Sequence, residues 1–162
     1  MTTSLPSSSA NQAESTAFGR LDERIRRWIW DRQWTDLKTI QENAVDPILE
    51  QTRDVILSAP TAGGKTEAAF LPICTKLVGR ASSGVGCVYV GPLKALFNDQ
   101  FGRLEELCAH LEIPVHRWHG DVAAQRKRRV LDHPEGILLI TPESLEALFV
   151  LQGPRLRGVF TG

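Results

Sequence analysis

The chain has little of what a secreted or membrane protein carries. Only three of its 162 residues are cysteines, Cys74, Cys87 and Cys108, and their wide spacing contains no C-x-x-C pair. This pattern is typical of reduced core cysteines in a cytosolic protein. No stretch approaches the roughly 20 consecutive apolar residues that cross a bilayer, and the N-terminus has no basic-then-apolar signal sequence. The sequence therefore predicts a soluble, cytoplasmic protein.

An excess of charge of either sign is also absent. Nineteen basic residues balance nineteen acidic ones, so the formal net charge is zero. A balanced total argues against binding nucleic acid by bulk electrostatic attraction, although it leaves room for a few placed basic groups. The four histidines form no plausible metal set with a cysteine, and no Ser/His/Asp or Cys/His arrangement indicates a nucleophile. A histidine–cysteine metal centre and nucleophilic catalysis are therefore disfavoured.

The chain divides into three segments by composition. Residues 1–20 are rich in Ser, Thr and Ala with few large apolar side chains, so we expect a disordered tail. Residues 21–52 form a helical lead-in, with helical apolar spacing over Leu21–Trp34 and again over Leu37–Leu49. Residues 53–162 then alternate between strand and helix patterns. At 42% apolar residues the whole chain can bury one core and is too short for two ordinary domains.

Alternating strands and helices indicate an α/β fold with a mostly parallel sheet and helices on both faces. The expected strands are Val55–Ser58, Val85–Val90, Val115–Trp118 and Ile137–Ile140, with a further one beginning near Val159. The expected helices are 64–78, 93–111, 122–131 and 142–151.

The first of these strands leads directly into Ala59-Pro60-Thr61-Ala62-Gly63-Gly64-Lys65-Thr66, which opens an alanine-rich helix. Backbone N–H groups of such a loop surround phosphates, and the helix N-terminus adds a partial positive charge. Lys65 would reach the β- and γ-phosphates, and the Thr66 hydroxyl would hold Mg²⁺. The usual first glycine of this motif is Ala59 here. A glycine turn beside a surface lysine is the weaker interpretation, because a strand and a helix flank the loop.

Two later strand ends share a pattern. Val90-Gly91-Pro92-Leu93-Lys94 and Ile140-Thr141-Pro142-Glu143-Ser144 each place a proline where a helix would begin, and Thr141 is a good N-cap. In a parallel sheet such helix N-termini collect at the carboxyl edge, where ligands bind. Their N–H groups suit nucleic-acid phosphates, and Lys94 adds a charge. One such end alone would indicate ordinary capping, but two beside a phosphate loop favour a nucleic-acid contact.

These motifs, in this order, resemble the first RecA-like domain of superfamily-two helicases, most closely the large-helicase-related (Lhr-like) DEAD/DEAH group. Residues 59–66 resemble its ATP-binding motif I, and residues 91–100 resemble motif Ia. His119-Gly120-Asp121 and residues 141–145 resemble later single-strand-binding motifs. Trp34, Ile40 and Gln41 stand where the adenine-reading Q motif has an aromatic residue, an isoleucine and a glutamine. The resemblance spans roughly residues 34–158 and implies a RecA-like P-loop NTPase fold.

The resemblance also implies roles for single residues. Gln41 would hydrogen-bond the adenine edge, since an amide can donate and accept at once, and Trp34 would pack on or near the base, with plain core packing as an even alternative. Lys65 and Thr66 are the expected catalytic residues, and Thr66 is the expected Mg²⁺ ligand. The residues expected to hold ATP are Trp34, Gln41, Pro60, Thr61, Ala62, Gly63, Gly64, Lys65, Thr66 and Glu67. The residues expected to contact nucleic acid are Pro92, Lys94, Gly120, Thr141, Pro142 and Ser144.

The function implied is that of the ATP-binding part of a helicase that translocates on DNA or RNA, holding single strands by their backbone without sequence preference. The chain ends at Gly162, about where the family's Asp-Glu pair would stand, so we expect a truncated N-terminal fragment that lacks the second RecA-like domain and does not hydrolyse ATP alone. A binding-only fragment or remnant without ATP turnover and an unrelated P-loop phosphotransferase stay open as alternatives. The basic run at residues 126–129 is expected to be a solvated helix face rather than a nucleic-acid contact.

Overall fold

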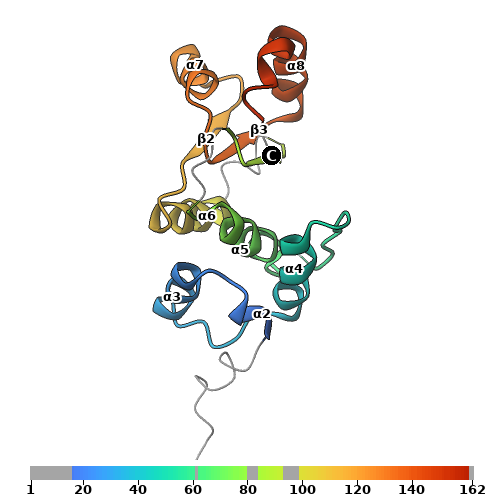
Figure 1. Cartoon of the computed structure of the whole chain (residues 1–162), viewed down its shortest axis with the longest axis vertical. Helices are drawn as coiled ribbons and strands as arrows, with labels where there is room; N and C mark the ends of the chain where they lie inside the picture. The colour runs from blue at the N-terminus through green and yellow to red at the C-terminus, as the bar shows by residue number, and fades with distance from the viewer. Residues whose placement is uncertain (1–15, 61, 80–83, 93–98, 161–162) are drawn as a thin grey trace, which may run out of the picture. The chain divides into compact units, whose positions relative to one another are not determined.

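The computed structural model of the chain describes residues 16–60, 62–79, 84–92 and 99–160 (Figure 1). The chain forms two compact units, Met1–Lys76 and Leu77–Gly162. The division falls near the end of a helix that follows the phosphate loop, whereas the sequence placed a boundary after residue 52. The loop therefore belongs to the same unit as the helical lead-in. Within the described residues no helix is long and apolar enough to cross a membrane.

The N-terminal unit is built from helices α2 (Thr16–Gly19), α3 (Glu23–Asp31), α4 (Thr39–Glu50) and α5 (Lys65–Leu77). The amphipathic pattern of α3 buries Ile25, Trp28 and Ile29, and the Asp22 side chain caps its start by accepting a 2.9 Å hydrogen bond from the amide of Arg24. Helix α2 lies within the segment expected to be a disordered tail. It is ordered because Ala17 is buried there, so the tail prediction was wrong for residues 16–19.

Helices α3, α4 and α5 are joined by long-range hydrogen bonds. The ammonium of Lys76 on α5 donates to the carbonyl of Leu49 on α4 at 3.0 Å. The amide of Asp22, at the start of α3, donates to the Thr75 hydroxyl on α5 at 3.2 Å. These bonds join α3 and α4 to the C-terminal part of α5, whereas Lys65 and Gln41 lie near the N-terminal ends of α5 and α4.

The expected strand Val55–Ser58 is not a strand in the structure. Residues 54–60 have no regular structure, Ile56 is 93% exposed and Val55 is 36% exposed. A strand is stabilised by hydrogen bonds to a neighbour, and no strand in the described part of the chain pairs with this segment. The strand prediction for this segment was therefore wrong.

The second unit is an α/β layer built on strands β1 (Cys87–Val90), β2 (Val115–Trp118) and β3 (Ile137–Ile140). The strands are parallel in the order β1-β3-β2, with Ile140 in register with both Val90 and Trp118. Crossover helices α6 (Asp99–His110) and α7 (Ala124–Asp132) connect them, and α8 (Pro142–Leu156) follows β3. The structure therefore confirms the predicted parallel α/β fold.

Both faces of the sheet are covered. All four residues of β3 are fully buried, as expected for the central strand of a parallel sheet. On one face Leu138 and Ile140 belong to a core with Val130 of α7 and Leu148 of α8. Figure 1 shows α7 and α8 on one side of the sheet and α6 on the other.

Several element boundaries differ from those expected. Strand β1 begins two residues later than expected, and α8 continues through Gly153 and Pro154 to Leu156 instead of ending at Leu151. No strand begins at Val159 within the described residues. The carbonyl of Val159 nevertheless accepts a 2.8 Å hydrogen bond from the amide of Val85, just before β1.

Candidate functional site

In the loop expected to bind phosphate, two backbone carbonyls hold the side chain of Lys65. Its ammonium donates to the carbonyls of Ala59 at 2.6 Å and Pro60 at 2.9 Å. The amide of Gly63 also donates to the Pro60 carbonyl, at 3.0 Å. An ammonium has three N–H donors, so two loop carbonyls hold it in place while one donor is left for a ligand. Lys65 is thus oriented at the first residue of α5, where the helix N-terminus favours an anion.

Two successive turns of the loop need the left-handed backbone region. Gly64 has a φ of 85°, which glycine adopts at no steric cost. A Cβ added to Gly64 would lie 2.8 Å from Nε2 of Gln41. Ala62 has a φ of 61°, which is costly for a residue with a side chain. The alanine at position 62 therefore adds backbone strain to the loop.

Gln41 lies against this loop. Its side chain is 3% exposed, and its Oε1 accepts a 2.9 Å hydrogen bond from the amide of Lys38 at the start of α4. The sequence analysis predicted that the side-chain amide of Gln41 hydrogen-bonds the adenine edge of the nucleotide. In the structure its Oε1 bonds the start of α4, and its Nε2 lies close to Gly64, so the side chain limits the space beside the loop.

Trp34 packs against Trp28 of α3 in an edge-to-face arrangement with ring centroids 5.6 Å apart. The guanidinium of Arg32 lies 4.5 Å from the centroid of the Trp28 ring. This packing agrees with the core-packing alternative for Trp34, and the half-buried ring keeps some surface. Its contact with a nucleotide base stays a prediction.

The remaining loop residues suit a bound nucleotide with its metal. Gly63, Thr66 and Glu67 are half-buried and Pro60 is exposed, whereas Thr61 lies outside the described residues. Mg²⁺ usually keeps several waters and binds through one or two protein oxygens together with phosphates. A single hydroxyl at Thr66, in the first turn of α5, fits that arrangement. No cluster of three His, Cys, Asp or Glu side chains suits a metal in the part of the chain that the structure describes.

In the second unit, the carboxyl ends of the three strands lie side by side. The amide of Gly91 donates to the Ile140 carbonyl at 3.1 Å, and the amide of Thr141 donates to the Trp118 carbonyl at 3.4 Å. Pro92, Gly120 and Thr141 therefore follow registered strand ends at one edge, as the sequence predicted. A Cβ added to Gly120 would meet nothing within 4 Å, so this edge is open there. Lys94 lies outside the described residues.

Thr141 caps α8 as expected. Its hydroxyl oxygen accepts from the Ser144 amide at 3.3 Å, and its O–H donates to the Ser144 hydroxyl at 3.0 Å, with Pro142 at the first helical position. Thr141 is 6% exposed, whereas Ser144 is half-buried. The Ser144 hydroxyl is therefore better placed than that of Thr141 to reach a ligand.

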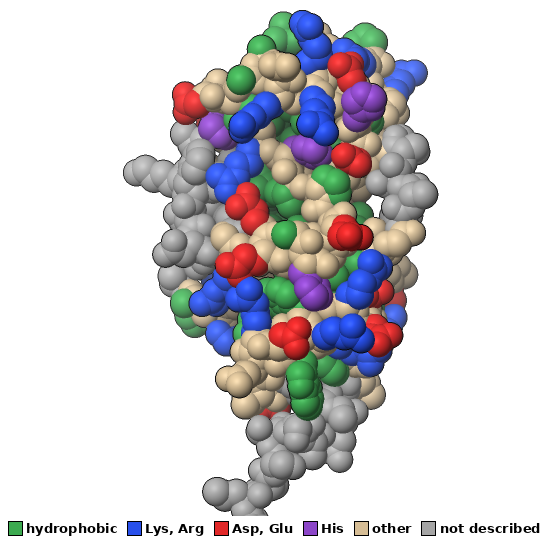
Figure 2. All heavy atoms as spheres, turned by 90° about the vertical axis from the view of Figure 1, so that its left-hand side faces the viewer, with side chains coloured by type: hydrophobic (Ala, Val, Ile, Leu, Met, Phe, Trp, Pro, Cys, Tyr) green, Lys and Arg blue, Asp and Glu red, His purple; other side chains and the backbone are tan. Residues whose placement is uncertain are grey.

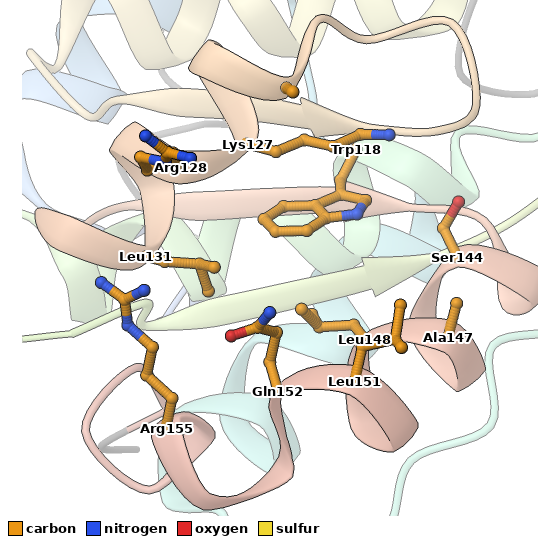
Figure 3. Close-up of a pocket in the computed structure, with 11 residues that line it drawn as sticks. Trp118, Lys127, Arg128, Leu131, Ser144, Ala147, Leu148, Leu151, Gln152 and Arg155 are labelled. Carbon is orange, nitrogen blue, oxygen red and sulfur yellow. The ribbon is translucent and has the colours of Figure 1, made fainter.

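A groove of about 430 Å³ runs between α7 and α8 from Ser144. Figure 3 shows the Trp118 indole at its centre, with Lys127 on one side and Leu148 and Gln152 on the other. In the basic run 126–129, Arg126, Arg128 and Arg129 are exposed, and Arg129 lies in the last turn of α7, where a cation offsets the helix dipole. Figure 2 shows Lys and Arg side chains interspersed with Asp and Glu on the face that it presents.

Burial shifts the pKa of two further side chains. It lowers the pKa of His116 on β2, while Glu135 opposes that shift and Arg129 adds to it. It also raises the pKa of the Cys87 thiol to about 11, with a further contribution from Cys108. Cys74 and Cys108 are buried thiols that form no disulfide in the described part of the chain, as expected from the sequence. None of these histidine and cysteine residues is among the residues expected to bind ATP or nucleic acid.

Comparison with known proteins identifies the family. The family model described as DEAD/DEAH box helicase matches residues 38–160 of this chain, which include the loop and the edge described above. The chain belongs to the DEAD/DEAH box helicase family. This match confirms the resemblance stated from the motifs.

Relatives of this DEAD/DEAH box chain include archaeal and eukaryotic helicases. The "ATP-dependent helicase Lhr-Core" of Methanothermobacter thermautotrophicus is 33% identical over 157 residues, covering 86% of this chain and 18% of the relative. The "Probable ATP-dependent RNA helicase pitchoune" of Drosophila melanogaster is 31% identical, covering 78% of this chain and 19% of the relative. The chain thus spans about a fifth of the length of each.

Solved structures agree on the fold. The helicase Lhr of Mycobacterium smegmatis, bound to single-stranded DNA and AMP-PNP, has a TM-score of 0.72 at 26% identity, covering 88% of this chain and 20% of that chain. The DEAD-box helicase Mss116, bound to single-stranded RNA and UDP-BeF, has a TM-score of 0.73 at 21% identity, covering 86% and 30%. The RecA-like fold predicted for this chain is therefore confirmed.

One residue that contacts the candidate nucleotide loop escaped the sequence analysis. The ammonium of Lys38 donates to the carbonyl of Ala62 at 3.2 Å, across 24 residues of sequence. The sequence could have marked Lys38 only by its position, three residues before Gln41 and at the start of a helix. Ser, Thr, Asp and Asn are the usual residues at such a position, so a lysine there is unusual.

Proposed function

We propose that this chain is the ATP-binding part of an ATP-dependent helicase or translocase that also binds the backbone of single-stranded DNA or RNA. The observation that carries the proposal is the position of Lys65, held by two loop carbonyls at the N-terminus of α5. Family membership and the bound AMP-PNP and single-stranded DNA of the related Lhr structure support it. ATP and Mg²⁺ are the proposed cofactors, and the cytoplasm is the proposed location.

Nucleotide binding is tested by titrating the 162-residue chain with Mg·ATP before and after Lys65→Ala. A charge-assisted hydrogen bond to phosphate contributes about 1.5 to 3 kcal/mol, so the substitution should weaken binding by about 10- to 150-fold. Lys76→Ala is the matched control, because Lys76 also donates to a backbone carbonyl of the same unit, away from the loop. Equal ATP affinity of the original chain and Lys65→Ala would show that the loop is not the nucleotide site.

Nucleic-acid binding is tested with single-stranded DNA and RNA oligonucleotides of several sequences at several salt concentrations. If the carboxyl ends of the strands form a track that binds the phosphates of a single strand, the affinity for the oligonucleotide falls with salt and varies little with its sequence. Ser144→Ala should weaken binding several-fold by removing a hydroxyl at the track. Arg128→Gln, on the basic run, should change it less if that run is a solvated face. A flat salt response or a strong preference for one sequence would contradict the track.

The alternative of a fragment that binds nucleotide without hydrolysing it stays a prediction. An ATPase assay on the same samples, with and without single strands, tests it: nucleic-acid-stimulated turnover that disappears in Lys65→Ala would contradict it. An unrelated P-loop phosphotransferase is not supported, because the family match extends from residue 38 through the strand-end motifs to residue 160.

A further inference from the structure

Lys38 is an unusual residue for the position that it occupies. It is the N-cap of α4 and has an extended backbone, with φ −67° and ψ 151°. A cation at a helix N-terminus lies beside the partial positive charge of unpaired N–H groups, which is electrostatically unfavourable. A lysine also lacks the side-chain oxygen that caps a helix. Local helix stability therefore does not explain this residue.

The contacts of Lys38 all lead to the phosphate loop. Its ammonium donates to the Ala62 carbonyl at 3.2 Å. Its Cδ would lie 3.2 Å from a Cβ added to Gly64, so the methylene stem lies along that residue. Its amide donates to Gln41, whose own amide group lies against Gly64. Lys38 thus contacts both residues that give the loop its left-handed turns.

The left-handed conformation of the loop at Ala62 needs contacts from neighbouring residues to stabilise it. Ala62 has a φ of 61°, a conformation that an alanine does not hold by its own preference. A hydrogen bond to its carbonyl fixes the peptide group that follows it, and that group carries the Gly63 amide. Since the orientation of the loop amides sets the shape of a phosphate site, the ammonium of Lys38 acts on the site through Ala62.

The charge of Lys38 also adds to the local field. The N-termini of α4 and α5 and the ammonium groups of Lys38 and Lys65 all lie at this loop. An anion with several charges would offset the mutual repulsion of these groups. A triphosphate is such an anion, whereas a neutral or singly charged ligand would offset much less of it.

We propose that Lys38 is a positioning residue of the nucleotide site, which holds the phosphate loop in its binding conformation through the Ala62 carbonyl and provides a second positive charge beside the phosphates. This proposal rests on the proposed function, because it concerns the same loop. It predicts that Lys38 strengthens binding of the phosphate part of the ligand, independently of the base.

The test compares the affinities of Mg·ATP and inorganic tripolyphosphate for the chain and its variants. Lys38→Met should weaken both ligands about three- to tenfold, the effect of one net hydrogen bond, and Lys38→Arg should stay within about twofold of the original chain. Lys76→Met is the matched control, since it removes an ammonium that donates to the Leu49 carbonyl at the other end of α4. It should leave both affinities unchanged. Gln41→Ala should weaken ATP more than tripolyphosphate.

Lys38→Glu separates a role in binding from a role in folding. An acidic side chain suits a helix N-terminus, so the melting temperature should not fall through α4, while tripolyphosphate binding should fall more than tenfold through repulsion. Unchanged binding in Lys38→Met and Lys38→Glu would overturn the proposal. An equal loss in Lys76→Met would also overturn it, because it would indicate a general charge effect. If Lys65→Ala binds ATP as the original chain does, the proposed function fails, whatever Lys38 does.

Discussion

Replacing Gly64 by alanine should weaken nucleotide binding through backbone strain. The φ of 85° at Gly64 costs an L-residue about 1 to 2 kcal/mol. The new Cβ would also lie 2.8 Å from Nε2 of Gln41 and 3.2 Å from Cδ of Lys38, so both side chains would have to move. In the variant without ATP the loop should relax to another conformation. ATP can then bind only if the loop returns to the left-handed conformation, and this return costs binding free energy. A penalty of 1 to 2 kcal/mol corresponds to about 5- to 30-fold weaker binding.

The assay is a calorimetric or fluorescence titration with Mg·ATP, together with urea unfolding of each variant. Gly153→Ala is the matched control, because it is the same chemical change within α8, where an added Cβ meets nothing within 4 Å. Alanine in a helix interior is more favourable than glycine by about 0.5 to 1 kcal/mol, but the Cβ of a residue before proline disfavours the helical conformation, and Pro154 follows Gly153. Gly153→Ala should therefore change the stability little and leave ATP binding unchanged, whereas Gly64→Ala should weaken ATP binding.

If Gly64→Ala bound ATP as tightly as the original chain, the left-handed turn would not be part of the binding conformation. If Gly153→Ala weakened binding equally, the loss would reflect a general disturbance rather than the loop. Either result would refute the reasoning from loop geometry.

Two further predictions follow from shifted pKa values. Burial raises the pKa of Cys87 to about 11, so at pH 8 iodoacetamide should alkylate it about 100-fold more slowly in the folded chain than in urea; equal rates would contradict its burial. His116 has a pKa below its usual 6.5 in the folded state, so the unfolded chain binds more protons there. The stability that comes from neutral His116 is fully present above pH 6.5 and is lost as the pH falls through the pKa of the folded state. His116→Gln should therefore flatten the decline in melting temperature between pH 7 and 5.

The parts of the fold that the sequence predicted best are those fixed by burial. Strand β3 begins and ends where the apolar run Ile137–Ile140 does, because both faces of a central parallel strand are buried and its composition shows it. The start of α8 was also predictable, since Thr141 supplies its own capping oxygen. Its end was not, because Gly153 and Pro154 indicate a helix stop while packing of Leu156 extends the helix.

The candidate site was predictable only where one residue type is required by the chemistry. Lys65 and Gly64 are marked by the loop pattern itself, and Gln41 by its place in the Q motif. Lys38 was not marked, because its role depends on a contact with Ala62 that spans 24 residues of sequence. The strain at Ala62 was also invisible, since alanine has no special backbone preference and its φ of 61° is set by the loop.

The two failed strand predictions have one physical cause. Val55–Ser58 and the segment from Val159 have apolar sequences suited to strands, yet a strand exists only when a neighbour supplies its hydrogen bonds. Ile56 is 93% exposed, and no strand in the described residues pairs with its segment. Val159 is 2% exposed and already accepts one hydrogen bond from Val85 beside β1. Val159 therefore accepts a single backbone hydrogen bond beside β1, whereas residues 55–58 pair with no strand in the described part of the chain.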